Sequence, residues 1–542
     1  MDALLTRNLP SLFIIGSVLS LLVNVGYRYW KVLKSVSPDI IQVVVKSSVF
    51  LYYARHDHYF SPLQSPYNNR LSSLGEQLLP SIPYINAARN DAIKNGHSAF
   101  AYYGYDVISW VSPLPAVEAR FLVADPLAIK TLASSRSRFP KNTIEYDSMR
   151  RFGSNILVIE GDAWKRQRKV VAPSFSEKNN RLVWDETIRL TLEVVERWGS
   201  TNSTVHINDC LADLTLPLAL FVIGSAGFGR RMTWSDETGN VPRGHTITFT
   251  EALHITSLNM IALCAFPKWV INMSKSLREA EKASEELGAY FREMIEERKS
   301  VYDIQEQEHH DLFSALIAMN MGTSKDGLDS QLTDEEVMGN IFIFILAGHE
   351  TSAHTLCFVL GLLAIEQEEQ EKMHQHIISI IPDQKLPVIE LAKITVEDSM
   401  LPTLRPNGSI EQVFVPANTE IRLDTVGTHY NPRYWPDPMA FKPSRFMEDY
   451  NRDAFVPFSV GSRACIGRGF SETEMVAVLT LLIKLYRVEL KDEKKYQGLT
   501  KLEQRELLLP TLQKVTTTLY RLENVLLAPV QAMGVARKEK KE

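Results

Sequence analysis

The sequence contains few cysteines and no excess of basic residues. Its four cysteines, Cys210, Cys264, Cys357 and Cys465, are spread over 542 residues, and none forms a C-x-x-C pair. This spacing excludes a secreted disulfide scaffold and a cysteine cluster for zinc or iron–sulfur, and it fits a reducing compartment. Acidic residues outnumber basic ones, 64 to 59, whereas nucleic-acid-binding proteins are typically basic. We therefore expect no nucleic-acid partner.

The sequence also lacks internal repeats and long low-complexity linkers. Hydrophobic residues make up 45% of the chain and charged residues 23%, which is ordinary for a globular protein. The length exceeds the roughly 250–300 residues at which a single hydrophobic core stops growing. Collagen-like and disordered chains are thereby excluded.

The N-terminal segment, about residues 9–29, is apolar and free of charge between Arg7 and Arg28. A helix needs about 20 such residues to cross the hydrocarbon core of a bilayer. A cleaved signal peptide is the alternative, but it has a shorter apolar stretch and a small-residue cleavage site. Basic residues gather after the stretch, which predicts a cytosolic body. We expect a membrane anchor over 1–35, a folded domain over 36–530 and a charged tail over 531–542.

The body of the chain is predicted to be mainly α with minor β at its two ends. Apolar residues recur at three- and four-residue spacing over most of 180–380, which is typical of helices. Strand patterns occur at Phe121–Val123, Val413–Val415 and Glu420–Asp424, and a helix is predicted at Leu127–Ser134.

One predicted helix carries a polar cluster inside an apolar run. It begins at Thr333 with Glu336 three residues later, which is a capping box, and it continues through the apolar Ile341–Ala347. The polar residues 348–352 follow before the apolar pattern resumes. Either this core helix passes a functional site or a polar face turns locally to water. His349 and His354 are five residues apart, which excludes the H-E-x-x-H zinc site.

Cys465 stands on a glycine-containing loop before a predicted helix. Free backbone N–H groups and the positive end of a helix dipole favour the thiolate form of a cysteine. Gly461 and Gly467 allow tight turns and the close approach of a large group. A lone thiolate here can serve as a nucleophile or as a metal ligand, whereas a buried structural cysteine is the usual alternative for an arbitrary position.

Several motifs together resemble the cytochrome P450 family. The loop matches the haem-binding signature F-x-x-G-x-R-x-C-x-G from Phe458 to Gly467 at all five defined positions. The resemblance extends over nearly the whole chain, and the N-terminal anchor resembles the microsomal branch. The other matching motifs are A-G-x-[DE]-T at Ala347–Thr351, W-x-x-x-R at Trp164–Arg168 and F-x-P-x-R-F at Phe441–Phe446.

The resemblance implies a cytochrome P450 fold and a role for each matching residue. Cys465 would be the axial ligand of the haem iron, and thiolate ligation favours O–O cleavage. Phe458 would shield the sulfur, and Arg463, Trp164 and Arg168 would bind the haem propionates. Glu350 and Thr351 would be the catalytic residues that deliver protons on the distal side. Gly461, Gly467, Ala347 and Gly348 would complete the haem-binding surface, with Gly348 leaving room for dioxygen.

One family motif is missing. The family carries E-x-x-R between the A-G-x-[DE]-T helix and the F-x-P-x-R-F segment, and no Glu from 352 to 464 has Arg three residues later. Glu390 and Lys393 come nearest, but Lys lacks the bidentate fork of Arg. Thr351 and Cys465 are 114 positions apart, fewer than is usual in the family. We expect a deletion near Ile394 that leaves Arg445 without its family partners. Either the sequence lacks a segment through a splice error or the protein is naturally impaired.

The resemblance implies a membrane-anchored monooxygenase with haem b that oxidises a small lipophilic substrate. The motif sequences resemble those of fungal members, many of which act in secondary metabolism, so we expect a hydroxylation or epoxidation in such a pathway. NADPH would supply electrons through cytochrome P450 reductase, with cytochrome b5 as a further partner, at the endoplasmic reticulum with a cytosolic catalytic domain. A non-catalytic membrane protein of the same family is the alternative, because the E-x-x-R segment is missing.

Overall fold

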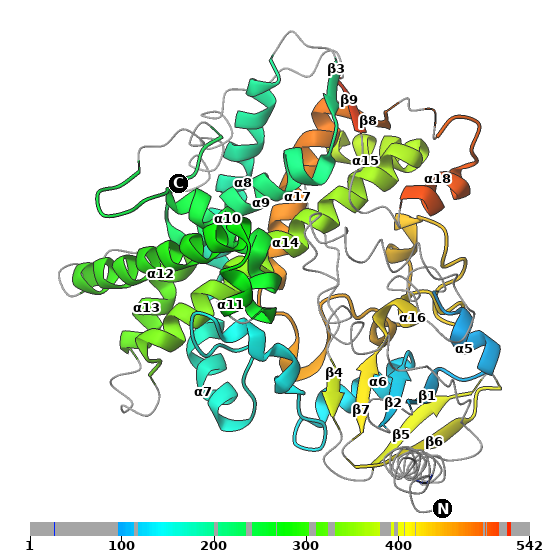
Figure 1. Ribbon diagram of the computed structural model, residues 1–542. Coiled ribbons are helices and arrows are strands. Elements are labelled where there is room, and N and C mark those ends of the chain that lie inside the picture. Colours follow the sequence, from blue (N-terminus) through cyan, green and yellow to red (C-terminus); the bar gives the residue numbers. More distant parts are fainter. Residues whose placement is uncertain are drawn as a thin grey trace, which may run out of the picture. The chain divides into compact units, whose positions relative to one another are not determined.

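The structure is a computed structural model of the chain (Figure 1). The predicted anchor over 1–35, apart from Tyr27, and the tail over 531–542 lie outside the described residues. The described residues are 27, 96–112, 118–199, 204–234, 241–266, 268–302, 311–322, 331–379, 392–394, 399–405, 407–417, 419–491, 494, 496–508 and 517–521.

These residues fall into two compact units. The first takes the described residues up to 176, those from 237 to 347 and those from 386 to 469. The second takes those from 177 to 236, from 348 to 385 and from 470 onward. The two units are described separately below.

The first unit contains a mixed four-stranded sheet in the order β1-β2-β7-β4. β2 pairs antiparallel with β1 and parallel with β7, and β7 pairs antiparallel with β4. Valine, isoleucine and phenylalanine side chains of this sheet pack with α6 in one buried core. A separate antiparallel pair, β5 and β6, contributes to the same core. The strands are β1 (Val107–Ser112), β2 (Glu118–Val123), β4 (Ala392–Ile394), β5 (Ser399–Leu404), β6 (Ile410–Val415) and β7 (Glu420–Leu423).

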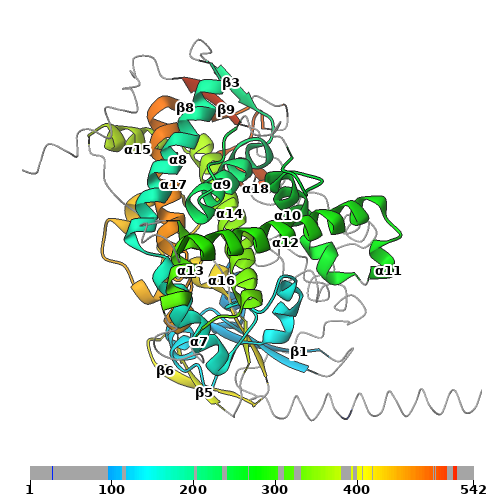
Figure 2. The same ribbon diagram turned by 90° about the vertical axis from the view of Figure 1, so that its left-hand side faces the viewer.

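Helices make up the rest of the first unit. α10 and α12 run side by side, as both views show (Figures 1 and 2). Its helices are α5 (Ser98–Tyr103), α6 (Pro126–Ser134), α7 (Gly161–Val171), α10 (Phe249–Ala265), α11 (Lys268–Ile271), α12 (Lys275–Tyr302), α13 (Leu312–Gly322) and α16 (Thr425–His429), with the first part of α14 (Asp334–Ile365).

The second unit is helical with a small antiparallel sheet in the order β3-β9-β8. Gln370 of α15 donates from Nε2 to the carbonyl of Val488, and its Oε1 accepts from the N–H of Val488, so that amide ties the helix to strand β8. Its elements are α8 (Glu177–Arg197), β3 (Thr204–Ile207), α9 (Leu216–Val222), the rest of α14, α15 (Gln367–Ser379), α17 (Arg468–Leu485), β8 (Tyr486–Leu490), α18 (Lys501–Leu508) and β9 (Thr517–Arg521).

The main sequence expectations for secondary structure are confirmed. α6 follows β2 as predicted, and Asp125 caps it by accepting from the N–H of Ala128. The strands predicted around 413–415 and 420–424 are β6 and β7. Sheet is not confined to the two ends of the body, because β3 lies within the helical stretch and pairs with β9. Lys393 of the nearest E-x-x-R-like pattern lies in strand β4, paired with Ile421.

Helix α14 passes the length and apolarity test for a membrane span among the described residues. About 61% of its most apolar window is buried inside the protein, as is usual for a core helix. Its predicted capping box is present. The Glu336 N–H donates to the Thr333 hydroxyl at 3.2 Å, and the Thr333 N–H donates to the Glu336 carboxylate at 3.0 Å. Two donors at the helix start are thereby satisfied.

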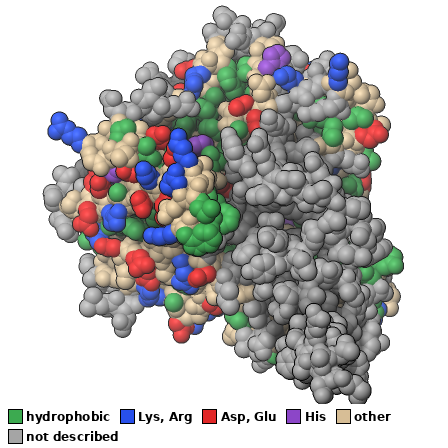
Figure 3. All heavy atoms as spheres, in the orientation of Figure 1, with side chains coloured by type: hydrophobic (Ala, Val, Ile, Leu, Met, Phe, Trp, Pro, Cys, Tyr) green, Lys and Arg blue, Asp and Glu red, His purple; other side chains and the backbone are tan. Residues whose placement is uncertain are grey.

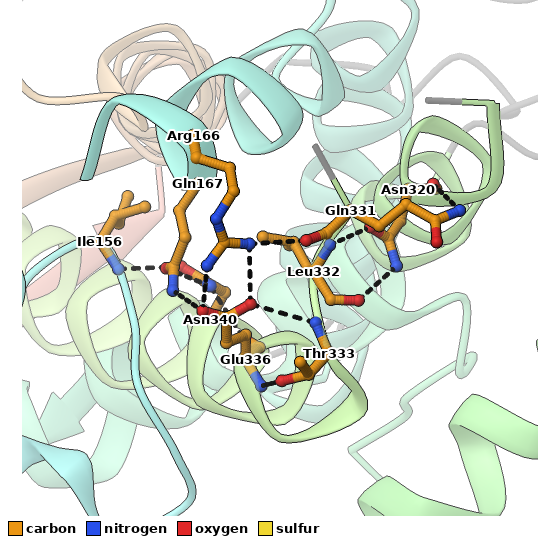
Figure 4. A network of polar contacts seen from close by, with 9 residues as sticks. All are labelled: Ile156, Arg166, Gln167, Asn320, Gln331, Leu332, Thr333, Glu336 and Asn340. Carbon is orange, nitrogen blue, oxygen red and sulfur yellow. Dashed lines mark hydrogen bonds and ion pairs between the residues drawn. The ribbon is translucent and has the colours of Figure 1, made fainter. Parts of the chain in front are cut away.

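A network of polar contacts joins this helix start to α7 (Figure 4). Arg166 donates to both carboxylate oxygens of Glu336, and Gln167 donates to one of them at 3.0 Å. One turn further along α14, Asn340 donates to the Gln167 side chain at 2.9 Å and accepts from the N–H of Ile156 at 3.0 Å. Because these side chains are buried or half-buried, the contacts fix α7 against α14.

The face drawn in Figure 3 shows no large patch of charge of a single sign among the described residues. There, the Lys and Arg side chains of the described residues alternate with Asp and Glu side chains. Binding to nucleic acid depends on clustered positive charge.

The Glu336 carboxylate should stabilise the fold in a pH-dependent way. Burial raises its pKa, but hydrogen bonds from Arg166, the Thr333 backbone and Gln167 bring the pKa below the usual value of 4.5. The ionised form is therefore favoured in the folded state, and its contribution is lost as pH falls through the lowered pKa. At pH 7, E336Q should reduce the free energy of unfolding by about 2 kcal/mol. The difference from the native chain should shrink below about pH 4.5.

Denaturant unfolding at several pH values measures this effect. D162N is the matched control, because the Asp162–Lys165 pair on the same helix α7 is exposed and exposed pairs contribute little. A loss of stability in E336Q that is equal at pH 4 and pH 7 would contradict the ion-pair interpretation.

Candidate functional site

The Cys465 loop belongs to the first unit and turns sharply at Gly461. Gly461 has a φ of 75°, and a Cβ there would lie 2.5 Å from the carbonyl oxygen of Ala133. Only glycine fits this turn without displacement of the backbone. The Cys465 N–H donates to the Phe458 carbonyl at 2.9 Å, which closes the loop, and α17 begins at Arg468. The sequence expectation of a tight glycine turn before a helix is confirmed.

Cys465 differs from the other cysteines whose side chains are described. It is half-buried, whereas Cys210 and Cys357 are fully buried. A hydrogen bond with Cys210, together with burial, raises the pKa of the Cys357 thiol well above its usual range. The side chain of Cys264 lies outside the description. Among the described thiols, Cys465 is therefore the one that a ligand can reach.

Phe458 and Gly467 flank the thiol. The Phe458 side chain is 7% exposed, and the guanidinium carbon of Arg468 lies 5.4 Å from its ring centroid. A Cβ added at Gly467 would meet Phe175 at an ordinary 3.7 Å. Gly467 is therefore not required by a local clash, in contrast to Gly461.

Arg463 is held by the chain segment before α7. It donates to the carbonyl oxygens of Ile156 and Ile159 at 3.2 and 3.0 Å, and it pairs with the Glu160 carboxylate. Its side chain is 9% exposed, and its Nε is buried without a hydrogen-bond acceptor. A buried guanidinium with an unsatisfied N–H is costly unless another acceptor is available.

Positive charge gathers around this side chain. The guanidinium carbons of Arg463 and Arg136 lie over the Trp164 indole, 4.1 and 4.6 Å from the ring centroid. Arg168 donates to the Ala464 carbonyl at 3.2 Å. Burial lowers the pKa of Arg463 to about 10; the charges of Arg136 and Arg168 contribute to this shift and Glu160 opposes it. Burial also lowers the pKa of Arg168, while attraction to Cys465 opposes that shift.

The structure thus brings together the loop residues and the W-x-x-x-R residues of α7. Trp164 is buried on α7 and Arg168 lies one turn later, as the spacing predicts. The sequence did not identify Arg136 or Glu160 as part of this cluster. Neither belongs to a motif, because Arg136 follows α6 and Glu160 directly precedes α7.

The polar cluster of α14 includes a row of partly exposed residues, although most of the helix is buried. Ala347, the last residue of α14 in the first unit, is exposed, although residues 341–346 are buried. Gly348 and Thr351, which begin the second-unit part of the helix, are half-buried. These positions recur at three- to four-residue spacing and so share one face. The interpretation of a core helix that passes a site is favoured over a fully solvated polar face.

Glu350 is buried beside this stripe. Its carboxylate Oε2 has no hydrogen-bond partner, and burial raises its pKa to about 8. The side chain is therefore mostly protonated at pH 7. The next turn is held by Thr355, whose hydroxyl donates to the Thr351 carbonyl at 2.8 Å. A Cβ at Gly348 would lie 3.3 Å from Ile223, which gives a packing reason for glycine there.

A second buried acid on α17 was missed by sequence analysis. Glu474 is 1% exposed, and burial raises its pKa to about 8. The hydroxyl groups of Ser352 on α14 and Ser471 on α17 lie 3.0 Å apart. The apolar spacing of α17 predicted a packed helix but gave no signal that an acid would be buried in it.

Arg445 has hydrogen-bond acceptors although residues 352–464 contain no E-x-x-R pattern. It donates to the carbonyl oxygens of Pro436, Asp437 and Ala440 at 2.8–2.9 Å. The loop before Arg445 thus satisfies the guanidinium with backbone oxygens in place of the family partners. Residues 380–391 and 395–398, around the expected deletion, lie outside the described part of the chain.

Comparison with known proteins places these residues in a family. The family profile described as Cytochrome P450 matches residues 114–401 and 406–516. "Cytochrome P450 monooxygenase 124" of Postia placenta is 43% identical over 464 residues, which cover 80% of this chain and 88% of that protein. "Cytochrome P450 monooxygenase ORF6" of Penicillium roqueforti is 28% identical over 66% of this chain and 71% of that protein.

Solved structures agree with this comparison at the level of fold. The crystal structure of the cytochrome P450DA heme domain superposes with a TM-score of 0.59. That superposition covers 81% of this chain and 94% of that structure at 18% identity. The mainly helical fold, the profile match and the 43% identical relative agree, and this chain belongs to the cytochrome P450 family of monooxygenases.

Proposed function

We propose that this protein is a membrane-anchored haem-thiolate monooxygenase that oxidises a small lipophilic substrate, with Cys465 as the axial ligand of the haem iron. The Cys465 loop is the observation that carries the proposal. Its thiol is accessible, Gly461 turns the loop, and Arg463 and Arg168 stand beside it. The relative of 43% identity, which is named a monooxygenase, supports the reaction class.

The residues present fit a haem. The buried Nε of Arg463 has no acceptor, and a carboxylate is the partner that a guanidinium prefers. The cations around Trp164 would hold the two haem propionates, and the thiolate of Cys465 would complete the iron coordination. When bound, the haem supplies the activation of dioxygen and the insertion of one oxygen atom into the substrate, with two electrons from a reductase.

The loop side chains would set the environment of the thiolate. The Phe458 ring is buried and would shield the sulfur from water, which would tune the reduction potential of the site. The N–H of Cys465 is already used by the Phe458 carbonyl and holds the loop closed. Gly461 keeps this geometry, and Gly467 would let the ring approach the loop backbone closely.

Glu350 and Thr351 would control protons on the distal side. The Glu350 carboxyl carries its proton at neutral pH because burial raises its pKa to about 8. It can therefore donate from Oε2, which no other group of the described chain occupies. The half-buried Thr351 hydroxyl would pass a proton between solvent, this carboxyl and the substrate. Ala347 and Gly348 would form the open surface beside them.

The remaining assignments follow from the sequence pattern. The uncharged stretch at 9–29 would anchor the protein in the endoplasmic reticulum membrane, with the catalytic domain in the cytosol. NADPH-cytochrome P450 reductase would deliver electrons, with cytochrome b5 as a further partner. Two relatives that are named monooxygenases come from fungi, and we infer a role in fungal secondary metabolism, with hydroxylation or epoxidation as the reaction.

The thiolate assignment predicts that C465A abolishes thiolate-ligated haem. A haem in this variant would lack its sulfur ligand, so the reduced, carbon monoxide-bound Soret band of the thiolate type should disappear. C210A and C357A are matched controls, because both thiols are buried in the second unit and belong to no haem motif, so the band should stay unchanged. Retention of the thiolate band by C465A would overturn the assignment. Loss of the band in the native chain would favour a non-catalytic family member.

The role of Thr351 predicts uncoupled turnover in T351A. The variant should bind haem normally, since the side chain is only half-buried and removing it opens no large cavity. Product formed per electron pair should fall by about 10²-fold, with peroxide released instead, because assisted proton delivery is typically worth that much. T351S keeps the hydroxyl and should restore most of the coupling. Equal coupling in the native chain and T351A would limit Thr351 to packing.

The raised pKa of Glu350 predicts a pH limit on turnover. A group whose folded-state pKa is raised stays protonated below it and loses its proton as pH rises through about 8. Coupled product formation should therefore decline above about pH 8 in the native chain, whereas the free energy of unfolding should decline between the usual pKa of 4.5 and about pH 8, where the folded state alone keeps the proton. E350Q should have low product formation with no decline over the same range.

E474Q serves as the control for the second buried acid. Glu474 has a similar pKa of about 8, so E474Q should remove part of the loss of stability between about pH 4.5 and pH 8. It should leave the pH profile of product formation as in the native chain. If E474Q removes the decline of product formation above about pH 8 and E350Q does not, Glu350 is not the proton donor.

A further inference from the structure

The backbone of residues 153–156 packs directly on the first part of helix α14. A Cβ added at Gly339 of α14 would lie 2.6 Å from the carbonyl oxygens of Gly153 and Ser154. A Cβ added at Gly153, whose φ is 129°, would lie 2.1 Å from the Glu335 carbonyl oxygen. Because a shift by one residue would bring a side chain into each contact, the two glycines fix where this segment lies on the helix.

Asn340 follows Gly339 on α14 and holds the same segment with a hydrogen bond (Figure 4). Its Oδ1 accepts from the N–H of Ile156 at 3.0 Å. Its Nδ2 donates to the Gln167 side chain at 2.9 Å and to the Glu336 carbonyl at 2.8 Å. Asn340 is fully buried, so water does not compete for its amide, and removal of that amide would leave the Ile156 N–H without this acceptor.

Ile156 links this helix to the loop that carries Cys465. Its N–H donates to Asn340, and its carbonyl oxygen accepts from Arg463 at 3.2 Å. Arg463 precedes Cys465 by two residues and its side chain is buried, so its acceptors determine where the loop can lie. A displacement of Ile156 from α14 would move one of those acceptors and the loop with it.

We propose that Asn340 is a positioning residue for the Cys465 loop. It acts through Ile156, whose two backbone groups connect Asn340 with Arg463. This inference rests on the proposed ligation of the haem iron by Cys465, because a thiolate ligand must be held in a defined place to bind the metal. Asn340 belongs to none of the motifs that match the family, and the path joins three segments that are far apart in the sequence.

N340L tests this path, because leucine has nearly the size of asparagine but offers no acceptor to the Ile156 N–H. The segment should then move on α14, and the loop should hold the thiolate less firmly. In the reduced, carbon monoxide-bound spectrum, the ratio of the thiolate-type band to the thiol-type band should fall about tenfold, which is the effect of losing one hydrogen bond of this kind.

Two other members of the network in Figure 4 provide matched controls. Asn320 of α13 is also buried, and it bonds with both backbone groups of Leu332 just before α14, at 2.6 and 3.1 Å. Q167L removes the other side-chain partner of Asn340 but leaves the contact with Ile156. N320L and Q167L should reduce the free energy of unfolding about as much as N340L, and each should change the band ratio by less than about twofold.

Amide hydrogen exchange of the native chain at rising urea concentrations tests the path without a substitution, so that the proposal can be decided even if N340L does not fold. The N–H of Cys465, which donates to the Phe458 carbonyl, should become exchangeable in the same opening as the N–H of Ile156. Their opening equilibria should therefore agree within about threefold at each urea concentration. The measurement can be made with and without haem.

Equal falls of the band ratio in N340L and N320L would show that Asn340 only stabilises the fold and would overturn the proposal. An equal fall in Q167L would assign the effect to α7 and would exclude the path through Ile156. Exchange of the Ile156 N–H more than about tenfold faster than that of the Cys465 N–H would also overturn it. If the native chain shows no thiolate-type band, the proposed function fails, while exchange in the haem-free chain still decides whether Ile156 holds the loop.

Discussion

A guanidinium that cannot reach water must find anions or carbonyl oxygens, and Arg463 imposes that requirement on the whole loop region. The loop before α7 turns its carbonyls of Ile156 and Ile159 toward the side chain, and Glu160 adds a carboxylate. The same segment is fixed from the other side, because the Ile156 N–H donates to Asn340 of α14. The position of the Cys465 loop in the first unit therefore depends on satisfying one buried cation.

Opposite electrostatic conditions prevail in the second unit. Glu350 and Glu474 are buried acids with pKa values raised to about 8, so each carries a proton at pH 7 where an exposed acid would not. Burial keeps these protons available, while the cations of the first unit keep Cys465 beside positive charge. The proposed proton donors thus depend on desolvation in the second unit. The proposed thiolate depends on guanidinium groups in the first unit.

Sequence analysis predicted the elements and motifs well where the signal is local. The Thr333–Glu336 capping box, the α6 helix after β2 and the glycine turn at Gly461 follow from neighbouring residues, and all three are present. It gave no signal for partners that the backbone supplies. Arg445 was expected to lack its family partners, and the Pro436, Asp437 and Ala440 carbonyls accept its hydrogen bonds instead. Backbone acceptors leave no pattern in a sequence, because every residue carries one.

The sequence by itself determined the family, and it predicted the thiol that would bind iron and the acid–threonine pair on the long helix, because these residues stand in motifs of fixed spacing. Tertiary structure decided which charges surround them. Arg136 and Glu160 lie far from Cys465 along the chain and belong to no motif, yet folding places both beside Arg463. It also decided that Glu350 stays protonated, since a pKa depends on how much water and charge surround a carboxyl in space and not on its neighbours in sequence.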